Sequence, residues 1–182
     1  SAGSRWGVLF VLYFCVMLIN SLFFLGHTLV MYFLNKNVNL TLFHINLHPA
    51  WFSNFTGIAF VGGGLIIFHY IKSWQNINGY ILPALKIAVS GLLASCALSC
   101  LPLGIYFSSA NGIVNSGWLI AYFSIMGLCY AILQSVQFSL VKTVLVESDY
   151  SLGLGIACYL NAIGSAVAIQ LSHVCLSHVH PN

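Results

Sequence analysis

Charged side chains are almost absent from this sequence. Lys and Arg together number 5, Asp and Glu number 2, and 60% of the 182 residues are hydrophobic. A soluble domain carries about a quarter charged residues, so this composition cannot make a water-facing surface. The net charge of +3 is small and dispersed, with no basic run, so we expect no nucleic-acid partner. The composition predicts an integral membrane protein.

The sequence also lacks the paired groups that catalysis or metal binding needs. The six cysteines lie in apolar segments and none forms a Cys-x-x-Cys pair, so we interpret them as small hydrophobic residues. One Cys/His cluster, formed by His173, Cys175, His178 and His180, lies where the last apolar stretch ends. It is more typical of polar residues leaving a bilayer than of a spaced set of zinc ligands. We therefore expect no enzyme activity, no metal and no cofactor.

Five apolar stretches are long enough to cross a hydrocarbon core of about 30 Å, which takes roughly 20 helical residues. They cover residues 6–34, 51–71, 83–107, 118–146 and 151–176. Helix is the expected backbone, because polar groups must pair internally in lipid and the runs lack the alternation of a barrel strand. The sequence thus predicts one all-α, polytopic helical bundle over residues 1–182, in contact with membrane lipid.

Tryptophans and basic residues indicate where the spans end and how they are oriented. All four tryptophans lie at predicted span ends, as expected of rings that settle at headgroup level. With the N-terminus in the cytoplasm, Lys36 is the one basic residue outside, and the other four lie on or near the inner side. The positive-inside rule therefore favours a cytoplasmic N-terminus, and we expect a plasma membrane or a bacterial inner membrane.

His27 is an ionisable side chain within a predicted span, which makes it a candidate functional residue. It shares a helical face with Asn20, Phe24 and Met31. Histidine titrates near neutral pH and could carry a proton. Equally, a neutral imidazole could hold neighbouring helices together through hydrogen bonds.

Two further polar stripes lie in the fourth and fifth predicted spans. Tyr130, Gln134 and Gln137 recur on one face of the fourth, and small residues with one amide follow one face of the fifth: Ala157, Asn161, Gly164, Ser165 and Ala168. Small residues let helices approach closely, and amides bridge between them. Each stripe therefore either packs against another helix or lines a wet cavity.

Several segments, in order, resemble the C-terminal half of a major-facilitator transporter, closest to the proton-dependent oligopeptide family. Residues 36–38 (Lys-Asn-Val) and 46–53 (Asn-Leu-His-Pro-Ala-Trp-Phe-Ser) are similar to the end of its seventh helix and the start of its eighth. Residues 83–93, opening Pro-Ala-Leu-Lys, resemble the start of the ninth helix, and 118–122 (Trp-Leu-Ile-Ala-Tyr) the entry to the tenth. Residues 151–165 look like the eleventh. The resemblance covers roughly residues 6–176.

The departures from that family pattern bear directly on function. Phe24 and Tyr130 stand where the family has acidic residues in its seventh and tenth helices. Gln134-Ser135 replaces a Ser-Pro bend, and Thr56-Gly57 replaces an Asn-Pro. With no buried carboxylate, the family's contact with a peptide ammonium and its carboxylate-based proton coupling do not carry over.

The resemblance implies a secondary-transporter-like half that would need an N-terminal half, since the fold requires two six-helix halves around a midplane site. We expect a small, neutral or apolar solute, contacted by Asn20, His27, Tyr130, Gln134, Gln137 and Asn161, because amides and a phenol orient a ligand without an ion pair. His27 is the candidate proton carrier. The alternative is a non-transporting structural subunit, buried among the helices of a larger membrane complex.

Overall fold

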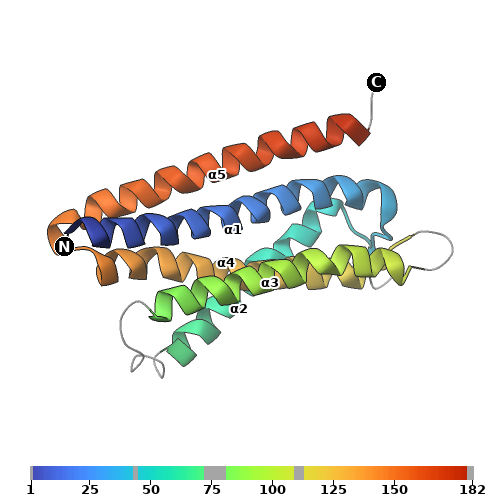
Figure 1. Cartoon of the computed structure of the whole chain (residues 1–182). Coiled ribbons are helices and arrows are strands. Elements are labelled where there is room, and N and C mark those ends of the chain that lie inside the picture. Colours follow the sequence, from blue (N-terminus) through green and yellow to red (C-terminus); the bar gives the residue numbers. More distant parts are fainter. Residues whose placement is uncertain (1, 43–44, 72–80, 109–112, 180–182) are drawn as a thin grey trace.

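The computed structural model describes residues 2–42, 45–71, 81–108 and 113–179, and in these ranges the chain is almost entirely helical (Figure 1). The long helices are α1 (Ala2–Asn37), α2 (Pro49–Ile71), α3 (Ile81–Tyr106), α4 (Ser116–Val144) and α5 (Tyr150–Val179). Two short antiparallel strands, β1 (Thr41–Leu42) and β2 (Ile45–Asn46), lie between α1 and α2, and one 3-10 turn, η2 (Glu147–Asp149), precedes α5. The predicted all-α bundle is confirmed.

Among the described residues, four helical segments are long and apolar enough to cross a membrane: Gly3–Leu34, Pro83–Tyr106, Ser116–Val144 and Glu147–Leu176. They agree with the predicted first, third, fourth and fifth spans, so the fold is that of a multi-pass membrane protein. The helix α2 forms where the second span is predicted but is not one of these four. Its role as a fifth membrane span stays a prediction.

The helix α4 is the centre of the bundle, with half of its span buried inside the protein. Glycines let α2 approach it closely: a Cβ on Gly127 would meet the backbone carbonyl oxygen of Thr56, and one on Gly63 would meet the side chain of Leu128. On another side of α4, the Cys129 thiol donates to the carbonyl of Ser90 in α3 at 3.1 Å. The helices α2, α3 and α4 therefore form one closely packed group.

The helix α1 packs on α4 through one regular stripe of side chains. The spacing alternates between four and three residues, the pattern of helices that pack side by side with an apolar repeat of about 3.5 residues. Most members are fully buried, while Phe23 and His27 are half-buried. We call this stripe the α1 seam: Leu9, Tyr13, Val16, Asn20, Phe23, His27, Val30 and Leu34.

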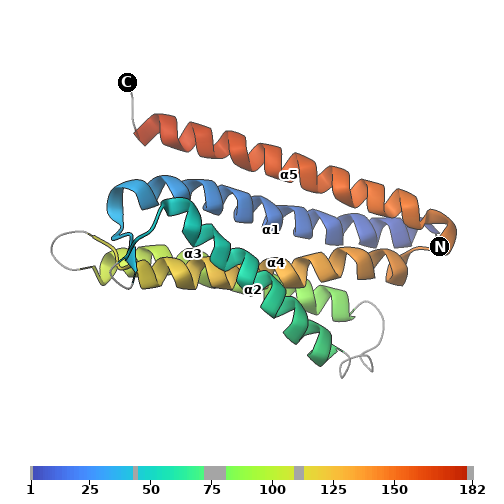
Figure 2. The same cartoon turned by 180° about the vertical axis from the view of Figure 1, so that it is seen from behind.

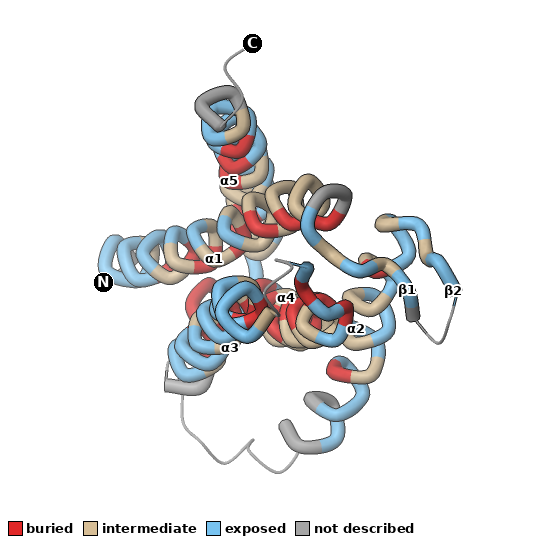
Figure 3. The backbone as a smooth tube through the Cα atoms, turned by 90° about the vertical axis from the view of Figure 1, so that its right-hand side faces the viewer, coloured by how far each residue is buried: buried red, intermediate tan, exposed pale blue. Residues whose placement is uncertain are grey.

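The helix α5 lies along α1 at the edge of the bundle, and its outer surface is open (Figure 3). Figures 1 and 2 show the two helices side by side, with α2 crossing α4 obliquely. Ala157, Gly164, Ala168 and Ser172 are buried on α5, and a Cβ on Gly164 would stand 2.7 Å from the Ser21 hydroxyl and 2.8 Å from Met17 Cγ. The small-residue stripe of the fifth predicted span is thus a packing surface, at least around Gly164.

Backbone hydrogen bonds join the end of α1 to the start of α4. The amide of Val114 donates to the carbonyl of Asn37 at 3.0 Å, and the amide of Asn39 donates to the carbonyl of Val114 at 3.1 Å. Asn115 then caps α4, since its side-chain oxygen accepts from the amide of Gly117 at 2.8 Å. This junction fixes where α4 begins relative to α1.

The close contact at Gly127 gives a first prediction. Gly127→Ala should lower the free energy of unfolding by about 1–3 kcal/mol, because a side chain there overpacks against the α2 backbone. Gly64→Ala is the matched control, since a Cβ at Gly64 meets nothing within 4 Å and alanine favours helix. Thermal unfolding of the detergent-solubilised chain measures both. Equal melting temperatures for the two variants would contradict this packing.

Candidate functional site

The six predicted site residues lie on the three helices that meet along the α1 seam. Asn20 and His27 come from α1, Tyr130, Gln134 and Gln137 from α4, and Asn161 from α5. The Asn20 Nδ2 donates to the Asn161 Oδ1 at 3.4 Å, which joins α1 to α5. Asn20 is 3% exposed, while Asn161 is half-buried, so the Asn20 end of this amide pair is isolated from solvent and lipid.

His27 and Tyr130 belong to one cluster of stacked rings. Phe23 lies between them, with its ring centroid 6.0 Å from that of His27 and 5.0 Å from that of Tyr130, in near-parallel planes. The ring of Phe123 meets His27 edge-on at 5.4 Å, and Phe60 of α2 lies 5.6 Å from Tyr130. The imidazole therefore sits between α1 and α4 in aromatic surroundings.

The two glutamines of α4 differ in their surroundings. Gln137 is buried, and its backbone carbonyl accepts a hydrogen bond from the Tyr13 hydroxyl at 3.3 Å. Gln134 is half-buried, and within the described ranges its side chain makes no hydrogen bond. The structure thus spreads the six residues along one interhelical seam, in three separate groups.

Some polar atoms in and beside this seam are buried without a hydrogen-bond partner in the described part of the chain. They are the Asn20 Oδ1, the Gln137 Nε2 and the Tyr122 hydroxyl. A further such atom, the Thr56 hydroxyl, lies on α2. In a bilayer, an unpaired polar group costs several kcal/mol. These atoms are therefore the strongest structural indication that the seam does more than pack.

Sequence reasoning missed three aromatic residues of this region. Phe23 stacks between His27 and Tyr130, Tyr13 reaches the backbone at Gln137, and Tyr122 lies beside Gly26, where an added Cβ would stand 2.5 Å from the phenol oxygen. Tyr13 and Phe23 could have been found from the four-and-three spacing that links them to Asn20 and His27. Tyr122 had no such signal, because its contact with Gly26 depends on which residue of α4 packs against that glycine of α1.

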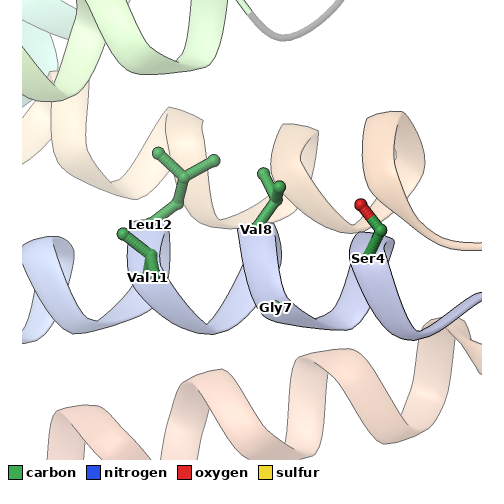
Figure 4. Close-up of a pocket in the computed structure, with 5 residues that line it drawn as sticks. All are labelled: Ser4, Gly7, Val8, Val11 and Leu12. Carbon is green, nitrogen blue, oxygen red and sulfur yellow. The ribbon is translucent and has the colours of Figure 1, made fainter.

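Two of the surface pockets formed by the described residues are not lined by any of the six residues. One is an open groove of about 410 Å³ along the first turns of α1, lined by Ser4, Gly7, Val8, Val11 and Leu12 (Figure 4). The other, of about 370 Å³, lies where α3 ends and α4 begins, between the parallel rings of Phe107 and Trp118 and the side chain of Asn39. The first offers one hydroxyl and the second a few amides and hydroxyls, so neither has catalytic groups.

No group of three metal-binding side chains occurs within the described residues. His173 and Cys175 are exposed on α5, whereas His180 and the side chain of His178 lie outside what the structure describes. The predicted interpretation of this cluster as polar residues at a span end stays a prediction.

No protein-family model matches the sequence, and no curated protein matches it either. The resemblance to the oligopeptide transporters therefore rests on the short motifs alone.

The amide pair between α1 and α5 gives a second prediction. Asn161→Leu should lower the free energy of unfolding by about 1–3 kcal/mol, because it removes the partner of a fully buried amide. Replacing both amides, as Asn20→Leu with Asn161→Leu, should recover most of that loss, since two apolar groups need no partner. A double-mutant cycle of unfolding in detergent measures the coupling. Additive losses would mean that the two side chains do not interact.

Proposed function

We propose that this chain is one helical half of a secondary-transporter-like membrane protein, and that the α1 seam with its neighbours on α4 and α5 forms one wall of a solute site. Two buried amide atoms support this proposal: the Asn20 Oδ1 and the Gln137 Nε2. Both lie inside membrane-spanning helices and have no hydrogen-bond partner among the described residues. Polar groups at this depth are costly and mark substrate or ion pathways by default. A solute that donates to the Asn20 oxygen, or one that accepts from the Gln137 nitrogen, would remove part of that cost.

The solute class follows from the groups that are present. The side chains along the seam offer amides, a phenol and an imidazole. Within the described ranges, the helices before Glu147 carry no Asp or Glu. Such groups orient a ligand by hydrogen bonds, while Phe23, Phe60 and Phe123 supply apolar surface. The proposed solute is therefore small and neutral or apolar, and His27 is the proposed proton carrier. The missing wall would come from an N-terminal half.

The motif resemblance and the positive-inside rule support the same orientation. The seventh helix of a major-facilitator fold starts in the cytoplasm, and charge counting independently places the N-terminus of α1 there. Arg5 and Lys142 are exposed at the end of the bundle where α1 begins and α4 ends. Our proposal includes this cytoplasmic N-terminus, in a plasma membrane or a bacterial inner membrane.

A second candidate function is a structural subunit of a larger membrane complex. The observation that favours it is the filling of the seam by rings, with Phe23 stacked on both His27 and Tyr130. In this alternative, the rings serve packing alone and no solute binds.

Solute binding separates the two functions and gives a third prediction. The chain in mild detergent is heated with each of a panel of uncharged solutes, such as glucose, indole and acetylated dipeptide amides. A solute at about 100 times its Kd should stabilise the fold by about 2.7 kcal/mol. His27→Ala and Tyr130→Phe should weaken the affinity about tenfold, the effect of losing one hydrogen bond to a ligand.

Matched controls are available on α5. His173→Ala and Tyr159→Phe change the same residue types at exposed positions and should leave the affinity unchanged. If every variant binds equally well, the solute does not contact the seam. If no solute of the panel stabilises the chain and other membrane subunits co-purify in fixed ratio, the structural-subunit function is the correct one.

Proton coupling gives a fourth prediction. The affinity of a solute found in this way should change between about pH 5 and pH 8, where an imidazole ordinarily titrates, and the change should vanish in His27→Ala. Binding is measured by tryptophan fluorescence at each pH, with His173→Ala as the control that keeps the dependence. A flat wild-type profile would remove His27 from the proton pathway while leaving solute binding intact.

A further inference from the structure

Asn39, Leu40 and Thr41 form an Asn-x-Thr sequence, the pattern at which N-linked sugars are attached. The pattern begins just after α1 ends, and Thr41 opens the hairpin of β1 and β2, which stands at the edge of the bundle (Figure 3). The side chains of Asn39 and Thr41 are exposed, while Leu40 is half-buried and packs against the buried cluster around Phe52. The leucine thus holds this segment on the bundle and leaves the two residues of the pattern at the surface.

The local hydrogen bonds leave the reactive atom of Asn39 free. The Asn39 Oδ1 accepts from the backbone amide of Thr41 at 3.0 Å and from the Thr41 hydroxyl, which makes an Asx turn. Within the described ranges, the Asn39 Nδ2 donates to no other group. The turn joins residues only two positions apart, so it can form as soon as this segment is synthesised. The bond from the Asn39 backbone amide to the Val114 carbonyl forms only later.

A second Asn-x-Thr sequence, at Asn54, is arranged differently. Asn54 is exposed, but it lies within α2. The Thr56 hydroxyl is buried and makes no hydrogen bond to any described residue, and the Thr56 carbonyl faces Gly127 of α4. The two sites therefore share a sequence pattern, but only the one at Asn39 presents both of its side chains in a surface turn.

A cleft beside Asn39 has room for a sugar. It has a volume of about 370 Å³, and Phe107, Ser108, Asn115 and Trp118 line it together with Asn39. The Phe107 ring is 66% exposed and lies parallel to the Trp118 ring, with centroids 6.0 Å apart. The Asn115 Oδ1 caps α4, so its Nδ2 is left as a donor within the described ranges. Aromatic surface with a few hydrogen-bonding groups suits a sugar, which offers C–H faces and hydroxyl acceptors.

We propose that Asn39 carries an N-linked glycan and that the first sugar packs in this cleft against Phe107. The inference rests on the cytoplasmic N-terminus of the proposed function, which puts the end of α1 and the hairpin on the outer side of the membrane. Of the two membranes proposed there, it selects the plasma membrane, which proteins reach through the compartment where N-linked sugars are attached.

The sugar donor is an oligosaccharide carried on a lipid diphosphate, and a membrane-bound transferase of the host cell catalyses the step. The Asn39 Nδ2 forms a bond to C1 of the first sugar and loses one proton to the transferase. The bond between C1 and the diphosphate oxygen breaks, and the lipid diphosphate leaves with the electron pair. Nothing is oxidised or reduced.

The experiment translates the full chain in the presence of endoplasmic-reticulum membranes and compares its electrophoretic mobility before and after endoglycosidase treatment. The wild type should give one slower band, which the enzyme removes. Asn39→Gln and Thr41→Ala should each abolish this band, because they remove the acceptor nitrogen and the hydroxyl of the pattern. Thr41→Ser, which keeps the hydroxyl, should retain it. Asn54→Gln is the matched control and should leave the band unchanged.

An N-terminal extension with its own Asn-x-Thr sequence reports the orientation in the same reaction, and a secreted glycoprotein confirms that the transferase is active. The extension should stay unmodified while Asn39 is glycosylated. If the extension is glycosylated and Asn39 is not, the orientation in the proposed function is wrong, and the inference falls with it. If neither is glycosylated in a chain that resists alkaline extraction, the orientation stands and the inference alone is overturned.

The contact between the sugar and Phe107 has its own measurement. Thermal unfolding in detergent compares the glycosylated chain with the same chain after enzymatic removal of the glycan. Removal should lower the melting temperature of the wild type. Phe107→Ala should abolish this difference while the glycan stays attached. Phe138→Ala, which changes an exposed ring on α4 away from the cleft, should preserve it. An undiminished difference in Phe107→Ala would show that the sugar does not pack on this ring.

Discussion

Hydrocarbon offers no hydrogen bonds, so every polar group that this chain carries into the membrane depends on a partner within protein or ligand. Most hydroxyls meet the requirement locally: Ser95, Ser99 and Thr143 each donate to a carbonyl one turn earlier. Amides are less easily satisfied, since each brings two donors and an acceptor. Asn20 finds one partner in Asn161, while its oxygen and the Gln137 nitrogen have none among the residues that the structure describes. The assignment of function to the seam depends on these few atoms.

The same requirement explains how the helices are grouped. At Gly127, Gly63 and Gly164, the lack of a side chain lets neighbouring helices come into direct contact. Dispersion supplies the attraction at these contacts. Between α1 and α4 the contact is made by large rings instead, with Phe23, Tyr122 and Phe123 spanning the distance. The two phenylalanine rings fill space without adding polar groups, and both lie against the imidazole of His27.

Much of the fold could be predicted from the sequence. Long apolar runs in a chain with so few charges must cross lipid, and there they form helices because the backbone has to pair internally. The helix α2 also forms where the second apolar stretch was predicted, whereas the short hairpin of β1 and β2 was not predicted. Periodicity identified the polar faces of His27, Gln137 and Asn161, but not their partners. The partners of these side chains depend on the register between helices that are far apart in sequence. No local sequence pattern encodes that register. The pairing of Tyr122 with Gly26 is of this kind.

That distance in sequence has a consequence for synthesis in the membrane. The hydrogen bond from Tyr13 to Gln137 spans 124 residues, and the one from Asn20 to Asn161 spans 141. The helix α1 thus leaves the ribosome long before either partner exists. Its amide and imidazole must be accommodated in the translocation channel, in lipid or against a chaperone until α4 and α5 arrive. Contacts of such separation form late in folding. Premature termination before α4 would therefore leave α1 with its most polar side chains exposed to the membrane, a state suited to recognition by quality control.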